Sequence, residues 1–208
     1  MVLFEGVEFE LFNDSNINSV AYGKFRSDIE RVSYNLQSEF LEVMNEYFEL
    51  PSVRKSIGIR ASFDLPGFDG KIIYLPFGPS RFKSVRGLIE VGFACAHETG
   101  HYLHWCANPV FSRRALGVKG GDVYLLAESV AELSALCFYG LTKRTPPRYE
   151  NSLLGAVYDF YMERGLDSSL DALTGLVGCD EIEPTWDLHI IKEKKRELGK
   201  KLKQKVIT

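Results

Sequence analysis

Apolar residues in the first quarter of the chain recur at the spacing of one helix face. The repeat ends at Pro51 and comprises Ile29, Val32, Leu36, Phe40, Val43 and Tyr47. Ser27 and Glu30 stand at the two positions of a capping box, so we expect an amphipathic helix that begins near Ser27. Upstream, apolar residues alternate with glutamates over residues 7–11, which predicts a half-buried strand.

Two short segments downstream show the alternation typical of strands. Apolar side chains occupy every second position over residues 57–63, and residues 72–75 form an apolar run after the break Pro66-Gly-Phe-Asp-Gly70. We interpret the two segments as a β-hairpin, and Pro76 and Pro79 favour an edge position for the second strand. An open edge can pair with an extended peptide, whereas an edge covered by the chain itself is the alternative.

The second half of the chain predicts mainly helices. We expect a helix over residues 84–107 that stops at Asn108-Pro109, a loop over 111–121, and a helix from Asp122 to about residue 138. A further helix over 151–164 ends at Gly165, and a shorter one follows over 168–176. The segments together predict an α+β fold, with a small antiparallel sheet packed on helices and a helical C-terminal part.

Domain organisation follows from one proline pair. Thr145-Pro-Pro147 is the best candidate for a boundary, so we divide the chain into a core over residues 1–144 and a helical extension over 145–208. That extension ends in a strongly basic segment, between Lys192 and Lys205, for which we expect a helix.

Composition narrows the class of protein. The chain has 208 residues, of which 45% are hydrophobic and 25% charged, which excludes disordered and fibrous proteins. The N-terminus lacks a basic segment followed by an apolar run, and no 18 consecutive residues are apolar, so we expect a cytoplasmic protein without a membrane partner. The four cysteines show no C-x-x-C spacing, which favours reduced thiols over disulfides or a cysteine metal site.

The formal charge of −3 is unevenly distributed. Residues 192–205 hold eight basic and two acidic side chains, a local charge of +6, which leaves 17 basic and 26 acidic residues, or −9, elsewhere. Such a run is usually a solvated helix face. Contact between this segment and nucleic acid or an acidic partner is the alternative.

Three of the four histidines fall within eight residues, in the sequence His97-Glu-Thr-Gly-His101-Tyr-Leu-His104. On a helix, His97 and His101 lie four positions apart on one face, about 6 Å from each other, close enough to share a metal ion. Two imidazoles suit zinc, and Glu98 beside them supplies the base that zinc-assisted hydrolysis needs. Two core histidines satisfied by hydrogen bonds are the alternative.

A hydrolytic zinc usually takes a third protein ligand, which must come from outside this motif. Glu128 lies 27 residues after His101 on the following predicted helix, and Glu132 stands one turn later on the same stripe. Two carboxylates on an otherwise apolar helix are costly to bury unless paired or metal-bound, although a solvated face also explains them. Glu132 could then accept a hydrogen bond from a ligand histidine.

Other aromatic side chains could border such a site. Tyr124, one turn before Glu128, is our first candidate for stabilising an oxyanion, with His104 and Tyr102 as further cleft candidates. A tyrosine that only packs, and a histidine satisfied within the core or at the surface, remain the alternatives for these three residues.

The residues Ala96-His-Glu-Thr-Gly-His-Tyr-Leu-His104 and Glu128-x-x-Ala131-Glu132 resemble the gluzincin metallopeptidases, most closely the ImmA/IrrE-type group. The resemblance covers roughly residues 27–141 and implies a zincin-like core with one zinc ion. By this resemblance His97, His101 and Glu128 are the zinc ligands and Glu98 is the general base. The group often has Asn or Asp at position 132, where this chain has Glu.

Our principal interpretation is a zinc metalloendopeptidase that hydrolyses a protein or peptide substrate. The resemblance implies a repressor or another regulatory protein as that substrate. The alternative is a non-catalytic regulatory protein that contains zinc and contacts its partner through the basic tail. A purely structural zinc site, however, needs no base such as Glu98 and normally has its fourth position closed. A third interpretation is a latent peptidase whose cleft is covered by the tail or by Cys179.

Overall fold

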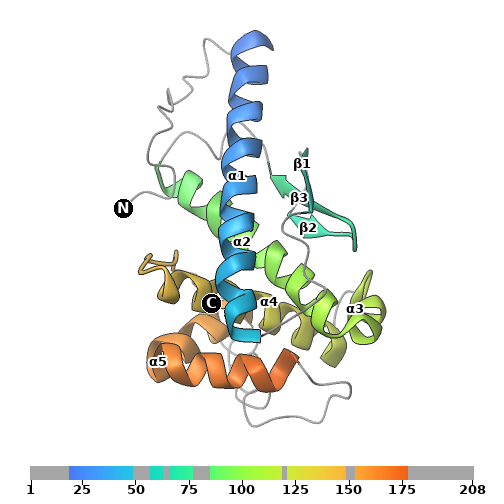
Figure 1. Cartoon of the computed structure of the whole chain (residues 1–208), viewed down its shortest axis with the longest axis vertical. Coiled ribbons are helices and arrows are strands. Elements are labelled where there is room, and N and C mark those ends of the chain that lie inside the picture. Colours follow the sequence, from blue (N-terminus) through green and yellow to red (C-terminus); the bar gives the residue numbers. More distant parts are fainter. Residues whose placement is uncertain are drawn as a thin grey trace, which may run out of the picture.

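A computed structural model describes residues 19–48, 57–62, 66–76, 85–118, 121–148 and 153–177. These residues form an α+β fold, as expected, in which helices predominate (Figure 1). The elements in chain order are α1 (Ser19–Phe48), β1 (Gly58–Ser62), β2 (Gly67–Phe68), β3 (Ile72–Pro76), α2 (Val85–Ala107), α3 (Pro109–Ala115), α4 (Gly121–Leu141) and α5 (Leu153–Val177). The expected strand over 7–11, the basic segment and Cys179 lie outside the described residues.

The sheet is mixed, and the hairpin predicted between its two longer strands is wrong. β1 pairs with β3 in parallel, whereas β2 pairs with β3 in antiparallel orientation, giving the order β1-β3-β2. The segment expected to be only a break therefore contributes a strand, and β3 is central instead of an edge. Asp69 holds the tight β2–β3 turn, because its Oδ1 accepts hydrogen bonds from the backbone N–H groups of Lys71 and Ile72.

Helix α1 covers the outer edge of β1. The Gln37 side-chain oxygen accepts a hydrogen bond from the Ile57 N–H at 2.9 Å, and the Tyr34 hydroxyl accepts one from the Ile59 N–H at 3.0 Å. These contacts satisfy backbone donors that would otherwise be unpaired at that edge. α1 begins at Ser19, so the capping-box pattern at Ser27 is internal to the helix and does not mark its start.

Helix α2 lies between α1 and α4, and its small residues allow α4 to approach closely (Figure 1). A Cβ atom at Gly100 would lie 2.7 Å from the carbonyl oxygen of Ala131 and 2.9 Å from its Cα atom. The backbone of α4 therefore approaches α2 directly at Gly100. Only glycine permits this contact, because a side chain there would overlap α4.

The segment after α2 is a helix, where we had expected a loop. Asn108 is the N-cap of α3, its side-chain oxygen accepts the Phe111 N–H at 3.1 Å, and Pro109 occupies the first turn. Asn followed by Pro therefore both ends α2 and begins α3, since proline lacks the N–H that the first turn leaves unpaired.

The C-terminal helix α5 packs on α4 and joins the same core. Leu170, Leu173 and Leu176 belong to the buried cluster that also contains residues of α1, α2 and α4. At Gly165 the backbone has φ 80° and ψ 177°, which interrupts the helix at the predicted position. Gly165 tolerates this conformation because it carries no Cβ.

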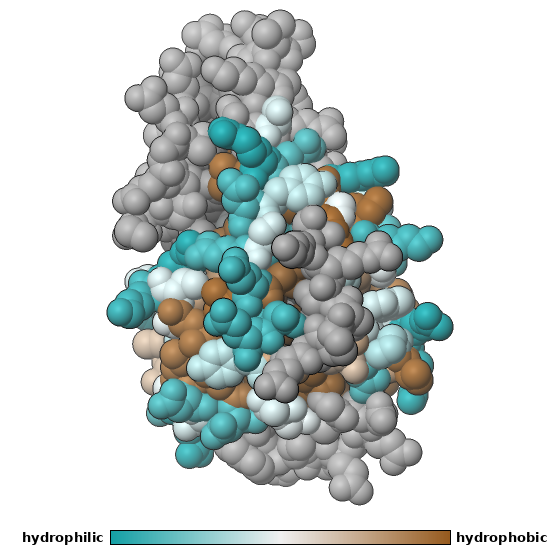
Figure 2. All heavy atoms as spheres, viewed as in Figure 1, coloured by the Kyte–Doolittle hydropathy of each residue, from teal (hydrophilic) through white to brown (hydrophobic). Residues whose placement is uncertain are grey.

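Polar side chains cover much of the described surface on the face shown in Figure 2, with apolar side chains between them. Among the described residues, α4 alone is long and apolar enough to span a membrane by length and composition. However, 78% of its most apolar window is buried inside the protein, so its packing on α2 and α5 accounts for that apolarity. The thiols of Cys95, Cys106 and Cys137 are free, as expected.

Gly100→Ala tests the contact between α2 and α4. The added methyl group overlaps the Ala131 backbone, so we expect the free energy of unfolding to fall by about 1–3 kcal/mol, measured by chemical denaturation. Gly175→Ala in α5 is the matched control, because its Cβ meets no atom within 4 Å and alanine favours helix by up to about 1 kcal/mol. Equal stability of the two variants would contradict the close approach.

Candidate functional site

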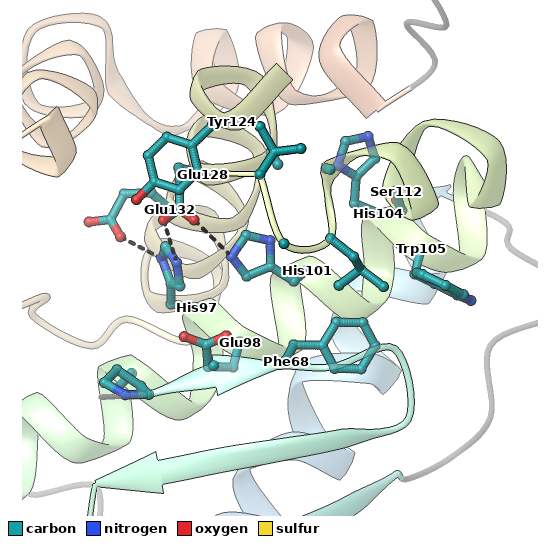
Figure 3. A pocket seen from close by; sticks show the side chains of 18 residues that line it. Phe68, His97, Glu98, His101, His104, Trp105, Ser112, Tyr124, Glu128 and Glu132 are labelled. Atoms are coloured by element: carbon teal, nitrogen blue, oxygen red, sulfur yellow. Dashed lines mark hydrogen bonds and ion pairs between the residues drawn. The ribbon is translucent and has the colours of Figure 1, made fainter. Parts of the chain in front are cut away.

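His97, His101 and Glu128 come together where α2 faces α4 (Figure 3). The Nε2 atom of His97 lies 3.4 Å from Glu128 Oε2, and Nε2 of His101 lies 3.6 Å from Glu128 Oε1. One potential ligand atom from each of the three residues lies within 4.8 Å of the other two. This group could hold a metal ion.

The spacing of these atoms fits a small tetrahedral site. Ligand atoms about 2.0–2.1 Å from a tetrahedral ion are about 3.3 Å from each other. The two nitrogen–oxygen distances of 3.4 and 3.6 Å are close to that value, and they involve the two different oxygens of the Glu128 carboxylate. Two imidazole nitrogens and one carboxylate oxygen also form a donor set that such ions accept, so the residues present fit a metal ion.

Glu132 fixes the orientation of His97. Its Oε2 atom lies 2.9 Å from His97 Nδ1, and the carboxylate is fully buried. The Nδ1 contact directs the other ring nitrogen of His97 toward Glu128. Oε1 of Glu132 has no hydrogen-bond partner within the described part of the chain. Glu128 and Glu132 thus both lie on the face of α4 that meets the histidines, as predicted from their spacing.

The electrostatics favour a neutral His101 and an ionised Glu128. Burial, together with neighbouring His97, lowers the pKa of His101 to about 3. Burial alone would raise the pKa of Glu128, but contacts with His97 and His101 lower it below its usual value. For His97, burial lowers the pKa, yet the carboxylates of Glu128 and Glu132 reverse this and raise it well above its usual value.

Glu98 points into the same space but is not one of the three grouped side chains. It is only 4% exposed, and it lines the cleft that also contains His97, His101 and Glu128 (Figure 3). Burial and the Glu128 carboxylate raise the pKa of Glu98 to about 7, although His97 opposes this. The buried carboxylate of Glu98 therefore lies beside the metal-binding group and forms no ion pair among the described contacts.

The cleft has a volume of about 570 Å³ and extends well beyond the histidines and carboxylates. Besides the candidate site residues, its walls come from β2 and the residue before it, α2, α3, the segment after α3 and α4. They include Pro66, Gly67, Phe68, Ala94, Trp105, Ser112, Ala115, Leu116, Gly117, Val118 and Ala127. Most of these residues are apolar. β2 is an edge of the sheet and borders the cleft, so the edge strand lies where β3 had been expected.

Tyr124 and His104 line the cleft, whereas Tyr102 does not. Burial raises the pKa of Tyr124, as do the charges of Glu128 and Glu98, so its hydroxyl remains a donor near these carboxylates. Tyr102 is 6% exposed and packs against Phe68 with ring centroids 6.0 Å apart, so its expected place in the cleft is corrected to the core. Its position directly after His101 turns it by about 100° around the axis of α2, away from the metal-binding group.

Sequence reasoning missed the far wall of the cleft. Trp105 packs edge-on against Phe68 at a centroid distance of 6.1 Å, and Ser112 comes from α3. The missed signal was the N-cap at Asn108, because it predicts the helix that carries Ser112.

The comparisons with known proteins give no relative of this chain: no family model, curated protein or solved structure matches it. The chemistry of the site therefore rests on the residues and geometry described above.

Removing Glu128 and Glu132 separately tests their different roles. Glu128→Ala removes a metal ligand, so we expect stoichiometric metal binding to be lost. Glu132→Ala removes only the contact that orients the His97 ring, so it should weaken the metal affinity about 10–100-fold. Competition between the protein and a chelator for Zn²⁺ measures both effects. Glu46→Ala on exposed α1 surface is the control and should leave the affinity unchanged. Equal affinities of wild type and Glu128→Ala would refute the grouping.

Proposed function

We propose that this protein is a zinc-dependent peptidase. The observation that carries the proposal is the buried carboxylate of Glu98, which lines an open cleft beside three potential metal ligands without belonging to them. A site with two histidines and one carboxylate as ligands, plus a free carboxylate, is typical of metal-assisted hydrolysis. Zinc is the proposed ion, since a donor set of two imidazoles and one carboxylate suits it better than Mg²⁺ or Ca²⁺, which prefer oxygen ligands.

The residues of the chain divide the chemistry among them. When bound, zinc supplies a Lewis acid that polarises the scissile carbonyl and acidifies water. Glu98 takes the proton of the attacking water and passes it to the leaving amine, which needs a carboxylate that is not itself a ligand. Glu132 holds the His97 ring through Nδ1, so that the other nitrogen stays available to the metal.

Tyr124 is the proposed donor to the developing oxyanion. Its hydroxyl stays protonated, because burial and the charges of Glu128 and Glu98 raise its pKa. A protonated hydroxyl in the cleft can donate a hydrogen bond to negative charge that appears only in the transition state. Figure 3 shows the Tyr124 ring beside the carboxylate of Glu128.

An extended peptide is the proposed substrate. Among the described strands β2 is an edge strand on the rim of the cleft, so its outer side is the proposed place for a peptide to pair across the site. The resemblance of the motif to ImmA/IrrE-type peptidases supports a regulatory protein or repressor as the natural substrate. The cysteine pattern and the lack of an 18-residue apolar run support a cytoplasmic location. In a non-catalytic protein with a structural zinc site, Glu98 would have no role as a base, and a fourth protein ligand would normally complete the coordination of the metal.

Glu98→Gln tests the proposed peptidase directly. The amide keeps the shape of the side chain but cannot accept the proton, so we expect bound zinc to stay stoichiometric and peptide cleavage to fall by about 10²–10⁴-fold. The uncleaved substrate should then be captured by this variant. Glu90→Gln, two turns earlier on α2, is the control and should cleave normally. Normal turnover by Glu98→Gln would remove the peptidase mechanism.

Tyr124→Phe tests the oxyanion donor. We expect kcat to fall by about 10²–10³-fold with metal content unchanged, because only a transition-state contact is lost. Tyr158→Phe in α5 serves as the control, since it removes a hydroxyl remote from the cleft. An unchanged kcat for Tyr124→Phe would show that this tyrosine only packs.

A further inference from the structure

Two polar side chains lie unpaired in the cleft on the side away from His97. His104 is 1% exposed and its Nε2 atom has no hydrogen-bond partner within the described residues. The hydroxyl oxygen of Ser112, a residue 8% exposed, likewise has no partner there. Both residues line the cleft, and Figure 3 shows them on the far side of His101 from His97.

The His104 ring is held firmly in place. It stacks on Phe111 with ring centroids 5.1 Å apart and an interplanar angle of 28°. His104 comes from α2 and Ser112 from α3, and Asn108 caps α3 between them. Buried polar atoms are normally hydrogen-bonded, because leaving them unpaired costs folding free energy. Two residues that line one cleft each carry an unpaired polar atom, and we take this as the sign of a ligand that pairs with them when the side chains turn toward it.

The chemistry of the pair indicates an uncharged ligand group. Burial lowers the pKa of His104 to about 4, so its imidazole is neutral and offers one donor and one acceptor. A serine hydroxyl also offers both. A group that satisfies them must donate and accept without carrying charge, as a primary carboxamide does.

The surroundings place this group on a side chain of a peptide. Apolar Trp105 and Leu116 line the cleft near the pair and suit an aliphatic stem. His104 follows His101 by three residues, which is about 4.5 Å along the helix axis, and residues of an extended peptide advance about 3.3 Å each. A side chain within two residues of the scissile bond can therefore reach the pair.

We propose that His104 and Ser112 form a specificity pocket for a carboxamide side chain, so that the protein selects Asn or Gln within two residues of the cleaved bond. This inference rests on the proposed peptidase function. His104 and Ser112 are specificity-determining residues here, and neither takes part in the proton transfers.

Binding of small probes tests the pocket without any need for catalysis. In protein with ¹³C-labelled histidine, the His104 signal is assigned from its loss in His104→Gln and followed during titration with three probes. We expect N-acetyl-glutamine methylamide to shift this signal and to bind at least about 10-fold more tightly than the norleucine and glutamate analogues. Equal binding of the norleucine analogue, or tighter binding of the glutamate analogue, would overturn the proposal.

Variants separate the pocket from a structural role. Ser112→Ala should weaken binding of the glutamine probe about 10-fold, whereas Ser169→Ala, a buried serine of α5 that bonds to the Gly165 carbonyl, should not. His104→Leu should abolish the preference for glutamine over norleucine without lowering Tm, since it removes an unpaired nitrogen. A large fall in Tm with the preference retained would overturn the proposal.

Digestion of a peptide library distinguishes failure of the pocket from failure of the proposed function. Wild-type protein loaded with zinc should cleave peptides enriched in Asn or Gln near the cut, and His104→Leu should lose that enrichment. Cleavage without enrichment would overturn the pocket and leave the peptidase. Selective binding of the glutamine probe without any cleavage would support the pocket and refute the peptidase.

Discussion

The close contact between Gly100 of α2 and Ala131 of α4 is the constraint on which the metal-binding group depends. On α2 the two histidines lie on either side of Gly100, and on α4 the two glutamates lie on either side of Ala131. The imidazole nitrogens and the Glu128 carboxylate lie 3.4–3.6 Å apart across the interface at which the two helix backbones touch. Packing of small residues therefore sets the geometry, and the charges act within it.

Several polar groups that this fold buries at a cost belong to residues of the cleft. Glu132 Oε1, His104 Nε2 and the Ser112 hydroxyl oxygen have no hydrogen-bond partner among the described residues, and all three residues line the cleft. Gln37 Nε2 and Arg144 Nη1 are likewise unpaired there but do not belong to the cleft. Burial also raises the pKa of Glu98. Poorly satisfied buried polar groups around a cavity are typical of a functional site. Ionisable side chains therefore line the end of the cleft between α2 and α4. The other end is lined by apolar side chains together with His104 and Ser112.

Sequence reasoning succeeded where the determinant was local. The boundaries of α2, the break at Gly165 and the shared face of Glu128 and Glu132 follow from helical periodicity and from residues with a single backbone preference. It failed where the determinant was a tertiary contact or a signal with two meanings. The parallel pairing of β1 with β3 depends on β2 lying between them in sequence, and Asn108 marks both the end of α2 and the start of α3.

Zinc K-edge X-ray absorption of the loaded protein tests most directly the proposal that one zinc ion is held by two imidazoles and one carboxylate. We expect nitrogen and oxygen scatterers only, at about 2.0–2.1 Å, with outer-shell scattering from two imidazole rings. Sulfur at about 2.3 Å, or scattering from one or three imidazoles, would contradict the assignment of His97, His101 and Glu128 as the metal ligands.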